Sequence, residues 1–146
     1  MIRAVVLEDL LPPATRPSLA DVVLAEEFEL TTAETDWVMI AAQFAQDVSG
    51  RVANLNLDRV AIRGADQHQS RRLTTGVSLR LFVEGAISAA AKSQARTVAY
   101  RSGANCAQAY GSDKGAMDAD ARGLVTRANS AEAAAAALSA LVEDRA

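Results

Sequence analysis

The chain has 146 residues, of which half are apolar and only 4% aromatic, and its formal net charge is −3. This length predicts a single domain, residues 1–146, that buries a sizeable core without disulfide or metal staples. A single cysteine, Cys106, excludes an intramolecular disulfide and favours a reducing compartment. No run approaches the roughly 18 apolar residues of a membrane span. We therefore expect a cytoplasmic protein that makes no use of a membrane.

The charge is unevenly distributed along the chain. Residues 1–58 contain three basic and ten acidic side chains, whereas residues 59–114 contain nine basic and three acidic ones. Two interpretations stay open. Either the acidic first part neutralises the basic part within the fold, or the clustered arginines meet an anionic partner.

The first third of the chain predicts strands followed by a long helix. Ile2 to Leu7 is a β-rich apolar run, residues 10–17 contain all three prolines and predict a loop, and residues 19–30 predict one or two antiparallel strands. Residues 31–34, Thr-Thr-Ala-Glu, match a capping box for the next helix. Its core-facing stripe comprises Trp37, Ile40, Ala41, Phe44, Val48, Val52 and Leu55.

The run from Leu57 to Asp66 predicts a short buried strand at the centre of the fold. Val60, Ala61 and Ile62 are apolar, and helical patterns precede and follow the run. A strand with helices on both sides is typical of a covered, central strand in an α/β sheet. Functional residues are expected at its carboxyl end, from Arg63 to Asp66.

The second half predicts alternating helices and strands. The expected elements are a polar loop at 67–72, a helix capped by Thr74 or Thr75 and running to about Gln94, a strand at 96–100, a helical segment at 102–110 that ends at Gly111, a helix capped by Ser112, and a last helix capped by Asn129 or Ser130. The last helix is rich in alanine, which has a high helix propensity and permits close packing.

Two stretches of the second half resemble RuvC-type Holliday junction resolvases. The family's short strand, helix and Gly-x-x-Lys turn are similar to YRSGANCAQAYGSDKGAMDADARGLV, and its preceding helix is similar to LRLFVEGAISAAAKSQ. The resemblance spans about residues 33–140. It implies a ribonuclease H-like α/β fold, with a mixed β-sheet and helices on both faces.

The resemblance also implies where a nuclease site would lie. Family members hold two divalent ions, Mg²⁺ or Mn²⁺, with four carboxylates, because these ions prefer hard oxygen ligands. The candidate catalytic residues are Glu8, Asp9, Asp66 and Glu132, and the candidate metal ligands are Asp9, Asp66 and Glu132.

The chain departs from the family pattern at two of the four carboxylate positions. Arg63 stands where the central strand should supply a carboxylate, and Ala135 and Ala136 stand where the last helix should supply its second one. A cation at a metal centre opposes metal binding. Glu8 and Asp9 are then acids at a solvated strand end, and Glu132 is a helix-start acid stabilised by the helix dipole.

A set of basic residues forms the second candidate site. The resemblance places DNA-backbone contacts in the loop after the central strand and at the Gly-x-x-Lys turn. The corresponding nucleic-acid-binding candidates are Arg63, His68, Arg71, Arg72 and Lys114, with Arg80 and Arg101 nearby. The net negative charge and the lack of interleaved aromatic residues argue against nucleic acid. His68 alternatively is an ordinary exposed loop residue, and the patch alternatively contacts acidic protein surface.

Three functions follow as hypotheses. The first is a resolvase-like domain without nuclease activity that binds branched or duplex DNA or acts as a scaffold. The second is a divergent Mg²⁺- or Mn²⁺-dependent endonuclease that cleaves branched DNA. The third is a protein–protein interaction subunit. A homodimer is also expected, because family members pair and because the helix at 75–94 is apolar on more than one face.

Overall fold

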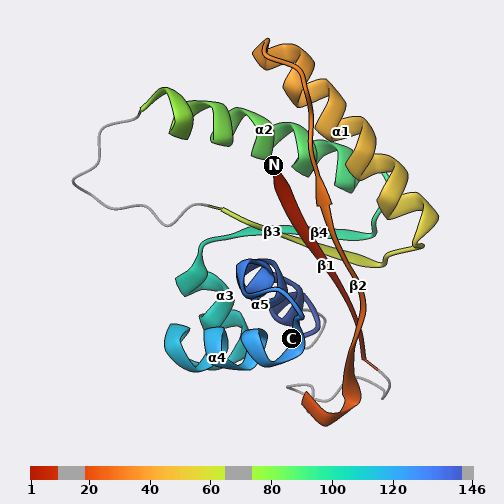
Figure 1. Cartoon of the computed structure of the whole chain (residues 1–146). Helices are drawn as coiled ribbons and strands as arrows, with labels where there is room; N and C mark the ends of the chain where they lie inside the picture. The colour runs from red at the N-terminus through yellow and green to blue at the C-terminus, as the bar shows by residue number, and fades with distance from the viewer. Residues whose placement is uncertain (10–18, 65–73, 143–146) are drawn as a thin grey trace.

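The structure of the chain, a computed structural model shown in Figure 1, describes residues 1–9, 19–64 and 74–142. The strands are β1 (Ile2–Asp9), β2 (Val22–Leu30), β3 (Arg59–Arg63) and β4 (Thr97–Arg101). The helices are α1 (Trp37–Asn54), α2 (Thr75–Lys92), α3 (Gly103–Tyr110), α4 (Lys114–Leu124) and α5 (Ala131–Ala140), with short 3₁₀ turns η1 (Leu19–Asp21) and η2 (Ala128–Ser130). By length and hydropathy, none of the helices in the described part of the chain qualifies as a membrane-spanning segment.

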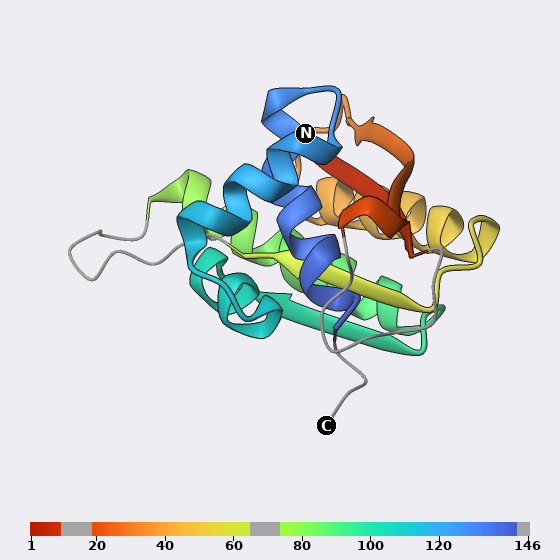
Figure 2. The same cartoon turned by 90° about the horizontal axis from the view of Figure 1, so that it is seen from below.

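The strands form two separate two-stranded ladders. β1 and β2 pair antiparallel, with Ile2 opposite Leu30 and an irregularity after Val6, and β3 and β4 pair in parallel. β1 runs roughly opposite to β3 and β4, since β1 points toward η1 while β3 and β4 point toward α3 (Figures 1 and 2). Together they make a mixed arrangement of parallel and antiparallel strands.

Helices cover both faces of the strands, which confirms the predicted α/β class. α1 and α2 lie on one side of the ladders, and α3, α4 and α5 lie on the other (Figures 1 and 2). Successive residues of β3 alternate between the two sides: Val60 and Ile62 pack in the cluster under α1 and α2, and Ala61 packs toward the cluster around α5. The period of two is that of a strand buried on both faces.

The prediction that the strand at 59–62 is central is wrong in one respect. Among the described residues β3 is hydrogen-bonded only to β4, on one of its two edges. The physical reason is that apolar residues on both faces of a strand indicate only that helices cover those two faces. They carry no information about neighbours at the strand edges, which are bound through the backbone.

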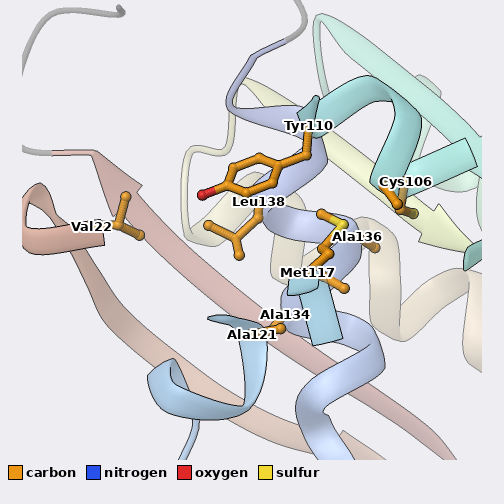
Figure 3. Close-up of a cluster of buried hydrophobic side chains, with 10 residues drawn as sticks. Val22, Cys106, Tyr110, Met117, Ala121, Ala134, Ala136 and Leu138 are labelled. Carbon is orange, nitrogen blue, oxygen red and sulfur yellow. The ribbon is translucent and has the colours of Figure 1, made fainter. Parts of the chain in front are cut away.

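The core has two main parts. The first lies between α1, α2 and the strands and includes Phe44, Val83 and Ile87, as the apolar stripes of the two helices predict. The second lies between α3, α4 and α5, where Tyr110, Met117 and Leu138 converge (Figure 3). Short alanines of α5 let its neighbours approach closely, and Ala134 is fully buried.

The helix caps were predicted in part. Thr74 caps α2 and Gly111 ends α3 with φ 75°, as expected, and Ser102 caps α3. The predicted capping box is wrong: α1 is capped by Asp36, which accepts from the Met39 amide at 3.1 Å. Asp113, and not Ser112, caps α4. In both cases a second capping residue a few positions away competes with the predicted one.

Glu27 of β2 holds the segment after α4 against the β1–β2 ladder through hydrogen bonds. Its carboxylate accepts from the Thr126 hydroxyl at 2.5 Å, and from the Thr126 and Arg127 amides at 3.1 Å each. The hydrogen bond from the Thr126 side chain is the largest cause that lowers the pKa of Glu27 from 4.5 to about 2.

Replacing this carboxylate is expected to change the acid stability of the chain. Because the folded-state pKa of Glu27 lies below its unfolded value, its contribution is complete above pH 4.5 and is lost as the pH falls toward 2. In Glu27→Gln the free energy of unfolding should be lower at pH 6 and should fall less between pH 4.5 and 2 than in the parent chain. Urea unfolding at a series of pH values measures this. Glu34→Gln, an exposed carboxylate before α1, is the matched control and should behave as the parent.

Candidate nucleic-acid interface

The carboxyl ends of β3 and β4 meet at one edge of their ladder. Arg63 pairs with Arg101 at the last register position, and the Gly64 amide donates to the Arg101 carbonyl at 2.9 Å. Ser102 follows at once and caps α3 by accepting from the Asn105 amide at 3.2 Å. The start of α3 therefore lies at the edge where parallel strands of α/β proteins commonly bind ligands, and the positive end of the helix dipole favours anions there.

Two cations converge over the first residue of α3. A Cβ atom placed on Gly103 would lie 2.7 Å from the Arg63 Cζ atom and 2.8 Å from the Lys114 Cε atom. Both long side chains therefore pass over Gly103, whose lack of a side chain makes the space. Lys114 is exposed and begins α4, where Asp113 accepts from the Ala116 amide at 2.8 Å. The sequence-based pairing of Arg63 with the Lys114 turn is thus realised in the geometry.

Arg101 has a different role at the same edge. Its Nη1 atom donates to the Ser139 hydroxyl at 3.0 Å, and Ser139 is fully buried in α5 and itself donates to the Ala136 carbonyl. This bond ties the end of β4 to the C-terminal half of α5. The side chain is directed into the protein, so we assign it to holding the edge in place.

A buried carboxylate next to this edge was not predicted from the sequence. Glu84 of α2 is only 6% exposed and accepts from the Arg80 Nε atom at 2.6 Å and from the Tyr100 hydroxyl at 2.5 Å. Burial, followed by the hydrogen bond to Glu84, raises the pKa of Tyr100 to about 12. The Tyr100 ring covers Gly64, where a Cβ atom would lie 2.5 Å from its hydroxyl.

The signal that could have identified Glu84 is its position in α2. It follows Val83 and comes three residues before Ile87, both buried core residues. An acid inside an apolar stripe requires a partner, because an isolated buried charge is costly. Arg80, one turn earlier, is the partner at the i,i+4 spacing.

The candidate catalytic acids are not all brought together. Glu8 is exposed near the end of β1, and Glu132 is exposed in the first turn of α5. Glu132 shares a surface hollow with Arg3, near the start of β1. Arg3 and Glu8 are five positions apart, a distance of about 16 Å along the strand. The fold thus places Glu8 and Glu132 toward opposite ends of β1.

The strand directions also separate Glu8 from Arg63. Arg59 at the start of β3 donates to the Ala140 carbonyl at the end of α5 at 3.2 Å. Because β1 and β3 run in opposite senses (Figure 2), the carboxyl end of β1 and that of β3 lie at opposite ends of the two ladders. Asp9 occupies the last position of β1, opposite Val22.

The remaining candidates fall outside the described residues. These are Asp66, His68, Arg71 and Arg72. Within residues 1–9, 19–64 and 74–142, no group of three or more His, Cys, Asp or Glu side chains is arranged to hold a metal ion.

Comparison with known proteins supports the fold. No family model matches the chain, and no curated protein sequence matches it. The structure of Thermus thermophilus RuvC is similar with a TM-score of 0.61 and 16% sequence identity, covering 81% of this chain and 76% of RuvC. T. thermophilus RuvC in complex with a Holliday junction substrate is similar with a TM-score of 0.59 and 16% identity, covering 84% and 80%. The predicted ribonuclease H-like, RuvC-like fold is confirmed.

Proposed function

We propose that this chain is a RuvC-fold module that binds the DNA backbone without cleaving it, at the edge where β3 and β4 end. The observation that carries the proposal is the convergence of Arg63 and Lys114 over Gly103 at the start of α3. Arg63 stands where the resemblance to resolvases calls for a metal-binding carboxylate. A cation there favours an anion directly and disfavours a divalent metal.

Phosphate is the anion that best fits this edge. The Arg63 guanidinium and the compact Lys114 ammonium bring two positive charges to the start of α3, where the helix dipole also favours an anion. Contacts of these kinds position a protein on DNA without reading its sequence. The similar fold of RuvC in complex with a Holliday junction supports DNA, and branched DNA in particular, as the ligand.

Binding as a function of salt tests the proposal. Fluorescently labelled single-stranded, duplex and four-way junction DNA are titrated with the chain at salt concentrations from 50 to 300 mM. Phosphate contacts release counterions, so affinity should fall steeply with salt for each DNA that binds. We expect the junction to bind most tightly. Affinity absent at 50 mM salt for all three forms would show that the basic edge serves a protein partner or internal charge balance.

A methyl group at Gly103 should disturb the proposed site without removing a charge. In Gly103→Ala the new Cβ atom displaces the ends of the Arg63 and Lys114 side chains, while alanine suits the first turn of a helix. We expect DNA affinity to fall about tenfold, with the thermal unfolding midpoint unchanged or raised. Gly85→Ala in α2, where nothing lies within 4 Å of the new atom, is the control and should keep full affinity.

If DNA affinity is unchanged in Gly103→Ala, the two cations do not contact the DNA. If the variant unfolds, circular dichroism separates that outcome from a loss of binding.

We further propose that the chain is a homodimer. Leu81 and Phe82 on α2 are 38% and 46% exposed, and the Phe82 ring lies 6.0 Å from that of Trp37, itself 36% exposed. Val38 and Met39 extend the patch along α1, where they are 65% and 50% exposed. β2 leaves this outer patch exposed, so a second copy is the proposed cover.

Phe82→Asp should therefore convert a dimer into a monomer in sedimentation velocity at tens of micromolar. An aspartate in the centre of an apolar interface would be buried without a partner, which costs several kcal/mol of association free energy. Val23→Asp, an exposed apolar residue on β2, is the matched control and should remain a dimer. A parent chain that sediments as a monomer at the same concentration would contradict the proposal.

A further inference from the structure

Glu84 of α2 is a buried carboxylate that the proposed DNA contacts do not use. It lies between the core residues Val83 and Ile87, and it is the only acidic residue that is buried among those whose burial the structure describes. A buried ion pair is seldom retained for stability alone, because apolar residues of similar volume often serve as well or better. The two hydrogen bonds of the Glu84 carboxylate indicate what its charge arranges.

One of these bonds leads to the last residue of β3 through Arg80. The Arg80 Nε atom donates to the Glu84 Oε1 atom at 2.6 Å, at the i,i+4 spacing of α2. The same guanidinium donates from its Nη2 atom to the main-chain carbonyl of Arg63 at 3.5 Å. Arg80 therefore bridges α2 and the end of β3, and Glu84 fixes the orientation in which it does so.

The other bond leads to the next residue, Gly64, through Tyr100. The Tyr100 hydroxyl donates to the Glu84 Oε2 atom at 2.5 Å. Burial, followed by this hydrogen bond, raises the pKa of Tyr100 to about 12, so the phenol remains a donor at neutral pH. The ring is held so close to Gly64 that a Cβ atom there would lie 2.5 Å from the Tyr100 Cζ atom. This approach requires a glycine.

Both routes meet at the peptide group that joins Arg63 to Gly64. Its carbonyl accepts from Arg80, and its N–H donates to the Arg101 carbonyl of β4 at 2.9 Å. Because peptide groups are planar, holding this one in place fixes the main chain on the carboxyl side of the Arg63 Cα atom, and with it the direction in which the side chain leaves. From there the Arg63 side chain reaches Gly103, where a Cβ atom would lie 2.7 Å from the Arg63 Cζ atom.

We propose that Glu84 is a positioning residue of the DNA-backbone interface. Without touching DNA, its carboxylate holds the end of β3 so that the Arg63 guanidinium lies over Gly103 beside Lys114. This inference rests on the proposed function, because it assigns Glu84 a role in the same site. A binding group that is already in place when the ligand arrives raises affinity by lowering the cost of ordering it.

Glu84→Gln tests this role with almost no change in side-chain volume. The amide has one acceptor oxygen in place of two and carries no charge, so it cannot hold both Arg80 and Tyr100 as the carboxylate does. We expect affinity for a labelled four-way junction at about 0.1 M salt to fall about tenfold, because a small displacement of a binding group is costly. Circular dichroism verifies that the variant folds. Unchanged affinity would overturn the inference.

A double-mutant cycle with Arg63 separates positioning from general stabilisation. In the Arg63→Ala background, Glu84→Gln should cause no further loss of affinity, because there is no guanidinium left to position. The slope of log affinity against log salt should also flatten by up to about one unit when Glu84→Gln is made in the parent, and not at all in the Arg63→Ala background. An equal loss in both backgrounds would leave Glu84 with a structural role alone and overturn positioning.

Glu27→Gln is the matched control for the loss of a carboxylate with several hydrogen bonds. Glu27 accepts from Thr126 and Arg127, and it belongs to the β1–β2 ladder. Glu27→Gln should lower stability, as described above, while its DNA affinity remains that of the parent. A fall in affinity as large as that of Glu84→Gln would mean that any loss of stability weakens DNA binding, and the inference would be wrong.

Hydrogen exchange without DNA tests the geometric part of the inference. In Glu84→Gln the Gly64 amide should exchange about tenfold faster than in the parent, because the peptide group that contains it is held less firmly. The amides of the β1–β2 ladder should exchange as in the parent. Unchanged protection of Gly64 would show that Glu84 does not hold the end of β3.

Tyr100→Phe keeps the inference testable if Glu84→Gln does not fold. The substitution keeps the ring against Gly64 and removes only the hydrogen bond to Glu84, so DNA affinity should fall several-fold in the parent and not in the Arg63→Ala background. Parent-like affinity in Tyr100→Phe would then overturn the inference. If the parent chain binds no DNA, the proposed function fails and the inference falls with it. If the parent binds and the Glu84 and Tyr100 variants bind equally well, the inference alone fails.

Discussion

The Arg63→Ala/Lys114→Ala double variant is expected to bind DNA about 100-fold more weakly at 0.1 M salt. Each cation that neutralises a phosphate contributes about one unit to the slope of log affinity against log salt. Two lost contacts therefore flatten the slope by about two units. If parent and variant bind equally at 1 M salt, a slope difference of two units amounts to about 100-fold at 0.1 M.

The matched control for this variant changes the same residue types at the other end of the ladder. Lys92 ends α2 and Arg96 precedes β4, so that both lie away from the start of α3. Lys92→Ala/Arg96→Ala removes the same net charge and should leave most of the slope intact. A parallel fall in both double variants would mean that DNA responds to net charge alone. An unchanged slope in Arg63→Ala/Lys114→Ala would place any DNA contact elsewhere on the chain.

Leu138→Ala is expected to lower the free energy of unfolding by about 2–5 kcal/mol. The Leu138 side chain is fully buried in α5 and lies among Tyr110 and Met117 of α3 and α4 (Figure 3). Removing it leaves a cavity, and the neighbouring residues of α5 are alanines too short to fill it. Such a loss is a large share of the 5–15 kcal/mol that typically stabilises a domain.

Chemical denaturation followed by circular dichroism measures this loss. Val23→Ala is the control: Val23 is 38% exposed on β2 and lies outside the proposed dimer patch, so its truncation should cost less than about 1 kcal/mol. Equal losses in the two variants would contradict the view that the α3–α5 cluster is the main core of this half. Leu138→Ala also tests how Arg101 is held at the edge, because Leu138 directly precedes Ser139, the residue of α5 to which the Arg101 guanidinium donates.

Local patterns in the sequence were sufficient for most of the elements. The apolar stripe of α1, the short apolar run of β3 and the alanine run of α5 each predict an element packed in the core, and all three elements form where expected. The helix caps were less certain, because Asp36 and Asp113 compete with nearby threonine and serine for the same role. Cap choice depends on the exact path of the chain, which local patterns do not determine.

The features that the sequence did not predict depend on contacts between elements that lie far apart in the chain. The edge of a strand is recognised through its backbone, so nothing in the residues of β3 indicates whether one or two strands lie beside it. Similarly, Glu84 and Tyr100 are sixteen residues apart, and their hydrogen bond forms only because α2 packs on β4. The direction of β1 relative to β3, which separates Glu8 from Arg63, is another long-range property.

The proximity of Arg63 and Lys114 could be expected from the sequence, because it depends only on where neighbouring elements end and begin. Arg63 ends β3, and Lys114 begins α4, two positions that parallel strands and the following helices bring to one edge. The excess of basic residues between positions 59 and 114 also made this edge a candidate anion-binding site. Under the proposed function, Arg63 at the position where the resemblance expects a carboxylate makes this edge favour an anion.

A single measurement tests the central proposal most directly: a labelled four-way DNA junction incubated with the chain in Mg²⁺ or Mn²⁺, with binding and cleavage followed in the same samples. The account predicts a saturable complex that weakens with salt and an intact junction in both metals after prolonged incubation. Metal-dependent cleavage that disappears in Asp9→Ala would contradict it, and would show that the candidate carboxylates Asp9, Asp66 and Glu132 form a working nuclease site despite Arg63.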